Sequence, residues 1–81
     1  MKIKVKLYAA VRDIVGAKEE DLEFPEGITV GSLLEDYIRR FPQIAKYRDH
    51  LILSVNKEYG APSRFLRDGD EVSFLPPVSG G

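Results

Sequence analysis

The sequence lacks cysteine and tryptophan altogether, and it has a single histidine, His50. Without cysteine, the chain has no disulfide, no thiolate metal site and no thiol nucleophile. One histidine cannot form a histidine pair around a metal ion, and a lone histidine in a loop is far more often a surface residue than a catalyst. We therefore expect no metal site, and the missing cysteines suit a reducing compartment such as the cytoplasm.

An excess of charge of one sign is also missing. Lysine and arginine together number 12, aspartate and glutamate 13, and the net charge is −1. Such a balance gives no broad attraction to nucleic acid or to an anionic membrane. No apolar run approaches the length that spans a bilayer, and the alternating start MKIKVK has no signal-peptide core. We expect a cytoplasmic protein with neither a nucleic-acid nor a membrane partner.

What is present fits one small soluble domain. The chain has 81 residues, of which 43% are hydrophobic and 31% charged, a composition typical of globular proteins rather than of disordered chains. Segments in which apolar and polar residues alternate with a period of two predict strands. These segments are residues 2–9, 20–24 and 71–75, and we also expect a strand over residues 51–55 and a short edge strand near Tyr59.

The clearest element is an amphipathic helix over residues 30–41. Its apolar stripe consists of Val30, Leu33, Leu34, Tyr37, Ile38 and Phe41. Thr29 is the expected N-cap, and Pro42 ends the helix. One or two helical turns are expected over residues 10–15, and residues 43–50 are expected to be irregular or briefly helical. The order of these elements predicts an α+β domain in which one main helix packs across one face of a mixed sheet.

A search for catalytic groups finds none in the body of the chain. The serines have no triad context, and the glycines form no phosphate-binding loop. The acidic run at residues 19–21 could bind a cation or a basic partner, but runs of charge usually face water, so a solvated strand edge is favoured. Residues 68–71 lack the spaced ligands of a calcium loop and are interpreted as a turn.

The sheet is expected to end at Leu75. The two prolines that follow it cannot donate the hydrogen bonds of a strand ladder. We therefore predict a domain over residues 1–75 and a flexible tail over residues 76–81. From Leu75, six residue steps allow the end of the tail to reach roughly 20 Å from the sheet.

The remaining candidate for chemistry is the end of this tail, Gly80-Gly81. Such an end also arises by chance or from cloning, but it is narrow and has no side chains, so it can enter a buried site. The carboxylate of Gly81 is ionised at neutral pH and can attack the α-phosphate of ATP to form an acyl-adenylate. Gly81 is therefore the predicted reactive residue, and Gly80 is predicted to allow its passage.

Outward-facing apolar residues form a second candidate feature. Tyr8 on the first strand and Leu75 on the last are expected to face away from the helix, and Tyr59 joins them if the edge strand forms. Scattered exposed apolar residues are common and need no function. If the three residues cluster, they form a docking patch beside the tail.

Nearly the whole chain resembles the small subunit of molybdopterin synthase, a sulfur carrier of the ubiquitin-like β-grasp group. The resemblance rests on residues 7–16 (LYAAVRDIVG), on Val55-Asn56 and on residues 68–81 (DGDEVSFLPPVSGG). The last run is the most specific, because its Pro-Pro-Val lead-in favours this branch over thiamine-type carriers and ubiquitin-like modifiers, which also end in Gly-Gly. As a departure, Tyr8 and Leu75 stand where relatives often carry phenylalanine.

The resemblance implies a β-grasp fold, with a mixed sheet of about four or five strands packed on one main helix and with short extra helical turns. It also implies that the first and last strands lie side by side, with Tyr8 next to Leu75. The implied partner-binding residues are Tyr8, Arg12, Tyr59, Leu75, Pro76, Pro77 and Val78. For Arg12, a surface salt bridge is an equally good explanation.

The resemblance further implies a reaction cycle in which the chain is not catalytic alone and binds no cofactor. An adenylating enzyme like those that activate ubiquitin consumes ATP to adenylate Gly81, and a sulfur donor converts the adenylate to a thiocarboxylate. The large synthase subunit then receives the tail, and the sulfur passes to cyclic pyranopterin monophosphate to build the dithiolene that holds molybdenum or tungsten. The same tail also fits a modifier of lysines, a carrier for thiamine synthesis or transfer-RNA thiolation, or a binding domain with an inert end.

Overall fold

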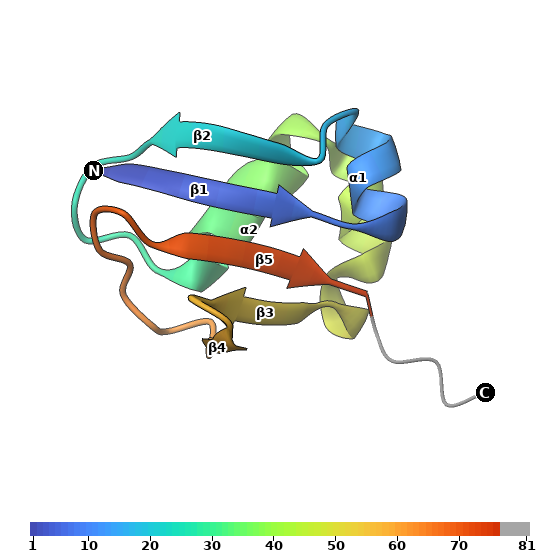
Figure 1. Ribbon diagram of the computed structural model, residues 1–81. Coiled ribbons are helices and arrows are strands. Elements are labelled where there is room, and N and C mark those ends of the chain that lie inside the picture. The colour runs from blue at the N-terminus through green and yellow to red at the C-terminus, as the bar shows by residue number, and fades with distance from the viewer. Residues whose placement is uncertain (77–81) are drawn as a thin grey trace.

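The computed structural model describes residues 1–76 of the chain, which form a five-stranded mixed sheet with its helices on one face and at one end (Figure 1). In chain order the elements are β1 (Lys2–Leu7), α1 (Ala9–Val15), β2 (Glu19–Glu23), α2 (Val30–Arg40), the 3-10 helix η1 (Pro42–His50), β3 (Ile52–Val55), β4 (Glu58–Tyr59) and β5 (Glu71–Leu75). None of these helices has both the length and the apolar character that a membrane crossing requires.

The sheet has the order β2-β1-β5-β3-β4, so the last strand of the chain lies at its centre. β1 and β5 are parallel, and their pairing runs from Lys4 with Glu71 to Leu7 with Phe74. The other neighbouring strands are antiparallel. A parallel pair needs a long crossover connection, which here includes α2. This is the ubiquitin-like β-grasp arrangement, and the adjacency of the first and last strands is confirmed.

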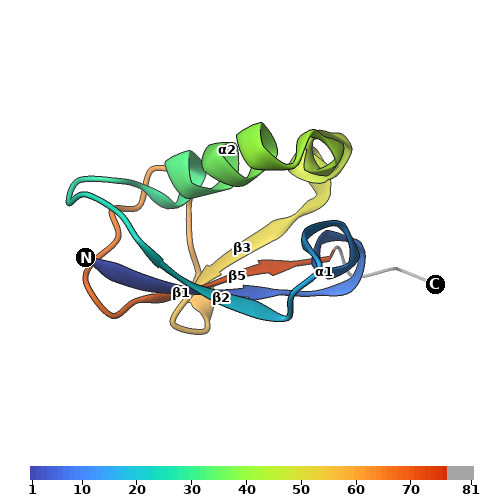
Figure 2. The same ribbon diagram turned by 90° about the horizontal axis from the view of Figure 1, so that it is seen from above.

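One face of the sheet is covered and the other is open. α2 lies across the covered face and α1 lies at the end of the sheet, whereas no helix of residues 1–76 crosses the opposite face (Figure 2). The core lies between α2 and the sheet, and its apolar members are all at most 7% exposed. They are Ile3, Val5, Leu7, Val11, Val30, Leu33, Leu34, Tyr37, Ile44, Leu53, Val55, Leu66, Val72 and Phe74.

The predicted ends of the main helix are confirmed to within one residue. Thr29 caps α2, because its Oγ1 accepts a hydrogen bond from the Ser32 backbone N–H at 3.2 Å. In return, the Thr29 backbone N–H donates to Ser32 Oγ at 2.8 Å, which completes a capping box. At the other end, the Phe41 N–H donates to the Tyr37 carbonyl at 2.7 Å, and Pro42 begins η1.

Gly31 occupies the first turn of α2, where glycine weakens a helix by its own conformational freedom. Its backbone N–H donates to the Pro62 carbonyl oxygen at 2.8 Å. A Cβ atom at this position would lie 3.0 Å from the same oxygen. The glycine therefore allows the loop before β5 to approach the start of the helix.

The first strand is shorter than the alternation predicts. β1 ends at Leu7, and the expectation that it continues to Ala9 is wrong. Tyr8 keeps an extended backbone, with φ −134° and ψ 153°, but serves as the N-cap of α1. Ala9 has φ 49° and is exposed rather than part of the core face. The left-handed conformation at Ala9 turns the chain out of the sheet, and side-chain alternation cannot report such a turn.

The remaining boundaries differ little from the predictions. β2 lies one residue earlier than expected, β3 begins at Ile52, and β4 confirms the short edge strand at Tyr59. The residues after Pro42, expected to be irregular or briefly helical, form the nine-residue helix η1. Ile44, which is fully buried, anchors this helix to the core.

The acidic run of β2 is a solvated edge only in part. Glu20 pairs with Val5, which is fully buried, so the Glu20 side chain lies on the covered face. Its Oε1 accepts a hydrogen bond from the Tyr37 hydroxyl at 2.5 Å, and Arg40 Nη2 lies 3.9 Å from the same oxygen. The expectation that the whole run is solvated is therefore wrong at Glu20, although its two neighbours are exposed.

Candidate functional site

The candidate site surrounds the point where the chain leaves the sheet. β5 is the central strand, so Pro76, the first residue after it, is flanked by the end of the parallel strand β1 and by the start of the antiparallel strand β3. Pro76 is exposed. The predicted site residues Pro77, Val78, Gly80 and Gly81 lie outside the described residues, and their roles stay predictions.

Three apolar side chains meet on the open face beside this point. Leu75 pairs with Ile52 of β3. Because Leu7 pairs with Phe74 on the covered face, Tyr8 and Leu75 follow as neighbours on the opposite face. Tyr8 is 39% exposed, Ile52 is 37% exposed and Leu75 is half-buried.

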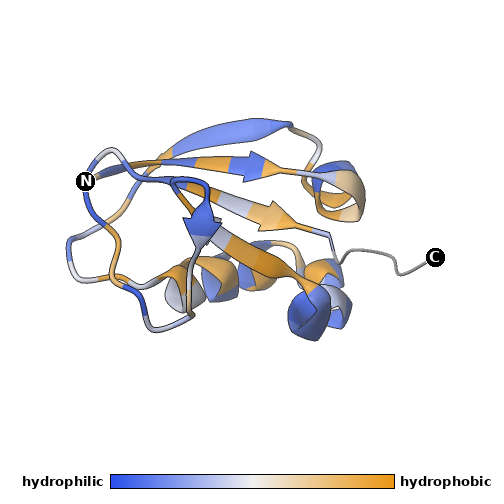
Figure 3. Ribbon diagram, turned by 60° about the horizontal axis from the view of Figure 1, so that its bottom comes forward, coloured by the Kyte–Doolittle hydropathy of each residue, from blue (hydrophilic) through white to orange (hydrophobic). Residues whose placement is uncertain are grey.

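Tyr59 extends this group across the sheet. It pairs with Ser54 of β3. The next residue, Gly60, faces the core, because a Cβ atom built there would lie against Val55. Tyr59, one position earlier, therefore faces the open side, where it is 73% exposed and diagonal to Ile52. We call Tyr8, Leu75, Ile52 and Tyr59 the docking row. Figure 3 shows that β3 and the end of β5, the strands that carry Ile52 and Leu75, are hydrophobic.

Ile52 was not among the residues that the sequence singled out. Its signal was present in the strand pattern, because Leu53 and Val55 alternate with Ile52 and Ser54. Once Leu53 and Val55 are assigned to the core, Ile52 must face outward with Ser54. The short length of β3 and the apolar residues on both of its faces hide this alternation.

Arg12 lies beside the docking row on α1. It lines an open depression of about 750 Å³ together with Lys6, Leu7, Tyr8, Lys18 and Glu19, so three cations outnumber one carboxylate there. Arg12 Nε is 3.8 Å from Asp13 Oδ1, and Lys6 Nζ is 3.5 Å from a Glu71 carboxylate oxygen. Exposed pairs at such distances hold their partners weakly, so the cations remain available to a negatively charged surface. The structure thus brings Arg12 and Tyr8 together, as docking requires, and also gives Arg12 the expected surface salt bridge.

Tyr37, Glu20 and Arg40 form a polar cluster next to the core, and this cluster has a structural role. Burial of Tyr37, followed by its hydrogen bond to Glu20, raises the pKa of the phenol above its usual range. The Arg40 guanidinium lies 4.4 Å from the centre of the Tyr37 ring and acts in the opposite direction. These groups lie on the covered face, away from the docking row, and they tie β2 to α2.

The buried polar groups of the described residues are paired, and these residues form no metal cluster. Among residues 1–76, no group of three or more histidine, cysteine, aspartate or glutamate residues could hold a metal ion. Every buried side-chain nitrogen or oxygen in this part of the chain has a hydrogen-bond partner. This arrangement presents the start of the tail between a partly apolar sheet face and a cationic flank.

Comparisons with known proteins agree with this geometry. The ThiS family model matches residues 5–81. A protein of Arabidopsis thaliana named molybdopterin synthase sulfur carrier subunit is 33% identical over 81 residues, which cover all of this chain and 84% of that protein.

Two solved structures share the whole fold. A structure described as molybdopterin converting factor subunit 1 of Pyrococcus furiosus is 32% identical, with a TM-score of 0.81, and the alignment covers 96% of this chain and 99% of that one. The small archaeal modifier protein 1 of Methanosarcina acetivorans is 28% identical, with a TM-score of 0.77, over 99% and 96% of the two chains. The match to the family model includes α1, the docking row and the last residues of the sequence, and the chain belongs to the ThiS family.

Proposed function

We propose that this chain is the sulfur carrier subunit of a molybdopterin synthase. The observation that carries the proposal is the similarity over the full length of the chain to proteins of that name, including one of Chlamydomonas reinhardtii that is 35% identical and fully covered. The family match runs through Gly81, the residue that would carry sulfur. The docking row supports the proposal, because an enzyme that receives the tail must hold the domain beside it.

The proposed chemistry takes place at the carboxylate of Gly81. In the first step this carboxylate attacks the α-phosphate of ATP, so that pyrophosphate leaves and an acyl-adenylate forms. A sulfur donor that delivers the equivalent of HS⁻ then displaces AMP, and one oxygen of the carboxylate is replaced by sulfur. A separate adenylating enzyme binds the ATP and catalyses the first step, so the carrier holds no cofactor of its own. The absence of cysteine supports a cytoplasmic location for this cycle.

The thiocarboxylate is then delivered to the large subunit of the synthase. That subunit binds the docking row and receives the tail, and the sulfur passes to cyclic pyranopterin monophosphate. The absence of a Cβ at Gly80 and Gly81 suits a narrow tunnel. Arg12 and the neighbouring lysines would contact acidic residues at the rim, where charges set orientation and association rate more than affinity.

Intact-mass measurement on protein isolated from its own cells tests the proposal. A fraction of the chain should end at Gly81 and be heavier by the difference between sulfur and oxygen. A variant with one residue added after Gly81 is the control, and it should never gain this mass. The proposal fails if thiocarboxylated carrier and the large subunit together do not convert the pterin precursor.

A second candidate function is the covalent modification of lysines through Gly81. The observation that favours it is the structural similarity to a small archaeal modifier protein. Tryptic digests of cellular protein should then contain lysines that carry residues 68–81 as a remnant, because Arg67 is the last site that trypsin cleaves, and these should disappear when the gene is deleted. A complete absence of such remnants in the wild-type cells would leave sulfur transfer as the function of the tail.

A further inference from the structure

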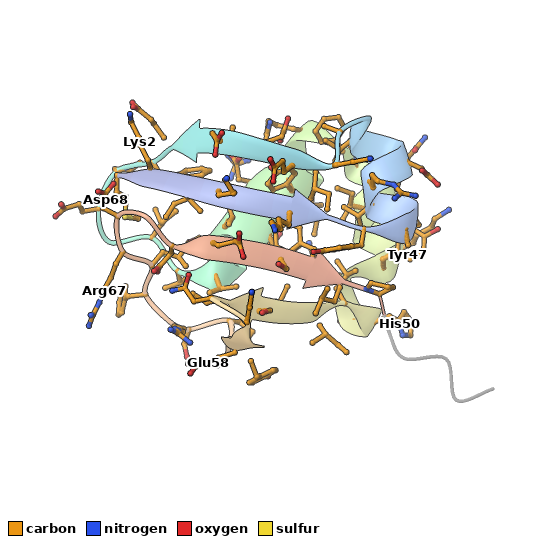
Figure 4. The ribbon with its side chains drawn as sticks, viewed as in Figure 1. Lys2, Tyr47, His50, Glu58, Arg67 and Asp68 are labelled. Atoms are coloured by element: carbon orange, nitrogen blue, oxygen red, sulfur yellow. The ribbon has the colours of Figure 1, made fainter. Side chains whose placement is uncertain are left out.

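An apolar pocket lies at the end of the domain from which the tail departs. Its volume is about 280 Å³, and its walls come from the start of α1, the end of η1 and the base of the tail. The lining residues are Tyr8, Ala9, Ala10, Val11, Tyr47, His50, Leu51 and Pro76. Figure 4 shows Tyr47 and His50 at this end of the molecule, beside the end of β5.

The pocket exists because small residues begin α1. Ala9 and Ala10 present only methyl groups, and the positive φ of Ala9 turns the helix away from the sheet. The opposite wall comes from the last turn of η1, whose C-cap Leu51 is half-buried. Larger side chains at the two alanines would fill this space. An open apolar hollow of this kind is hydrated at a free-energy cost unless another apolar group enters it.

The pocket is continuous with the docking row. Tyr8 contributes to both, and Pro76 follows directly after Leu75, which also belongs to the row. A partner that covers the row and reaches the tail must therefore pass over the mouth of the pocket. The cationic depression around Arg12 adjoins the row on the other side of Tyr8.

We propose that this pocket receives one large apolar side chain, such as leucine, methionine or phenylalanine, from the large subunit that takes the tail. This inference rests on the proposed function and names a further contact of the same complex. The large subunit is the better occupant than the adenylating enzyme, because the similar proteins are named subunits of a synthase, and stable complexes bury more apolar surface than transient ones.

Filling the pocket tests the proposal. Ala10→Phe places a ring in the hollow from α1, where Ala10 is half-buried. The matched control is Ala45→Phe, because Ala45 is an exposed residue of η1 that does not line the pocket. The dissociation constant for the isolated large subunit should rise roughly ten- to hundredfold for Ala10→Phe, the effect of losing one buried side chain. It should stay within about twofold of wild type for Ala45→Phe.

A second pair of variants guards against misfolding of Ala10→Phe. His50→Glu brings a negative charge to the mouth of the pocket from an exposed position, whereas Gln43→Glu makes the same change of charge at an exposed position elsewhere on η1. Only His50→Glu should weaken binding, by roughly tenfold, because a charge beside the pocket opposes entry of an apolar group. Thermal melting should show both proteins folded.

The outcomes separate this inference from the proposed function. If wild-type carrier binds the large subunit and both pocket variants bind equally well, the pocket proposal is wrong while the proposed function stands. If the pocket variants lose thiocarboxylation by the adenylating enzyme but keep their affinity for the large subunit, the adenylating enzyme fills the pocket and the proposal is wrong. If removal of residues 78–81 shifts the NMR signals of Ala10 and Tyr47 in the free protein, the chain's own tail occupies the pocket, and the proposal is overturned.

Discussion

The two faces of the sheet use neighbouring residues of the same strands in different ways. On β3, Leu53 is 7% exposed and Ile52 is 37% exposed. On β5, Phe74 is fully buried and Leu75 only half-buried. The covered face packs against α2 and stabilises the domain, whereas the open face keeps apolar side chains in contact with water. Hydrophobicity along a strand therefore does not distinguish a residue that holds the fold from one that is available to a partner.

The largest expected effect is on the covered face. Phe74→Ala should lower the free energy of unfolding by about 3–5 kcal/mol, because it removes a fully buried ring and leaves a cavity in the core. Leu75→Ala, on the open face, should cost about 1 kcal/mol or less. Urea denaturation of the two variants measures both values. Equal losses would show that the two faces do not differ in the way described.

A substitution on the open face should affect binding to a partner more than it affects stability. Ile52→Glu should weaken binding to the large subunit roughly ten- to hundredfold, because it places a charge at the centre of the docking row. Its unfolding free energy should change by about 1 kcal/mol or less. Phe65→Glu is the control, since Phe65 is 67% exposed but lies outside the docking row. A similar loss of affinity in both variants would contradict a localised docking surface.

Tyr37, on the covered face, is expected to make the stability of the domain depend on pH. The pKa of Tyr37 is raised in the folded protein, so the folded state holds this proton more tightly than the unfolded state, whose phenol titrates near pH 10. The contribution of this group is fully present below about pH 10, and above it stability falls by up to about 1.4 kcal/mol per pH unit. Denaturation of wild type and Tyr37→Phe between about pH 9 and pH 11, on either side of the usual phenol pKa, should show a smaller decline in stability for the variant. Parallel declines would remove Tyr37 as the cause.

The smallest expected effect concerns the position of the helix that covers the sheet. Thr29→Ala removes the acceptor of the Ser32 N–H and should cost about 1 kcal/mol of unfolding free energy. Thr29→Ser keeps a hydroxyl at the N-cap and should change the free energy of unfolding by only about 0.3 kcal/mol. Thermal melting compares the two variants directly. If serine does not restore stability, the capping box is not what positions the start of α2.

Local signals were sufficient for most of the elements. The apolar stripe from Val30 to Phe41, together with Thr29 and Pro42, predicted α2 to within one residue, because a helix is defined by contacts between residues close in the sequence. The same reasoning failed at Ala9, where a single left-handed residue ends the strand pattern without any change in hydrophobicity. It also failed at Glu20, whose burial depends on Tyr37, a residue 17 positions away.

The sequence by itself determined the kinds of elements and their order along the chain, because periodicity and capping residues are local properties. The resemblance placed the last strand beside the first, but only the tertiary structure decided that β3 lies on the other side of β5, since strand order depends on which distant segments pair. That pairing places Tyr8, Leu75 and Ile52 in one row, and it opens the pocket between α1 and η1 at the base of the tail. The four residues of the docking row come from three strands and a helix cap, and strand alternation alone does not show that they are neighbours.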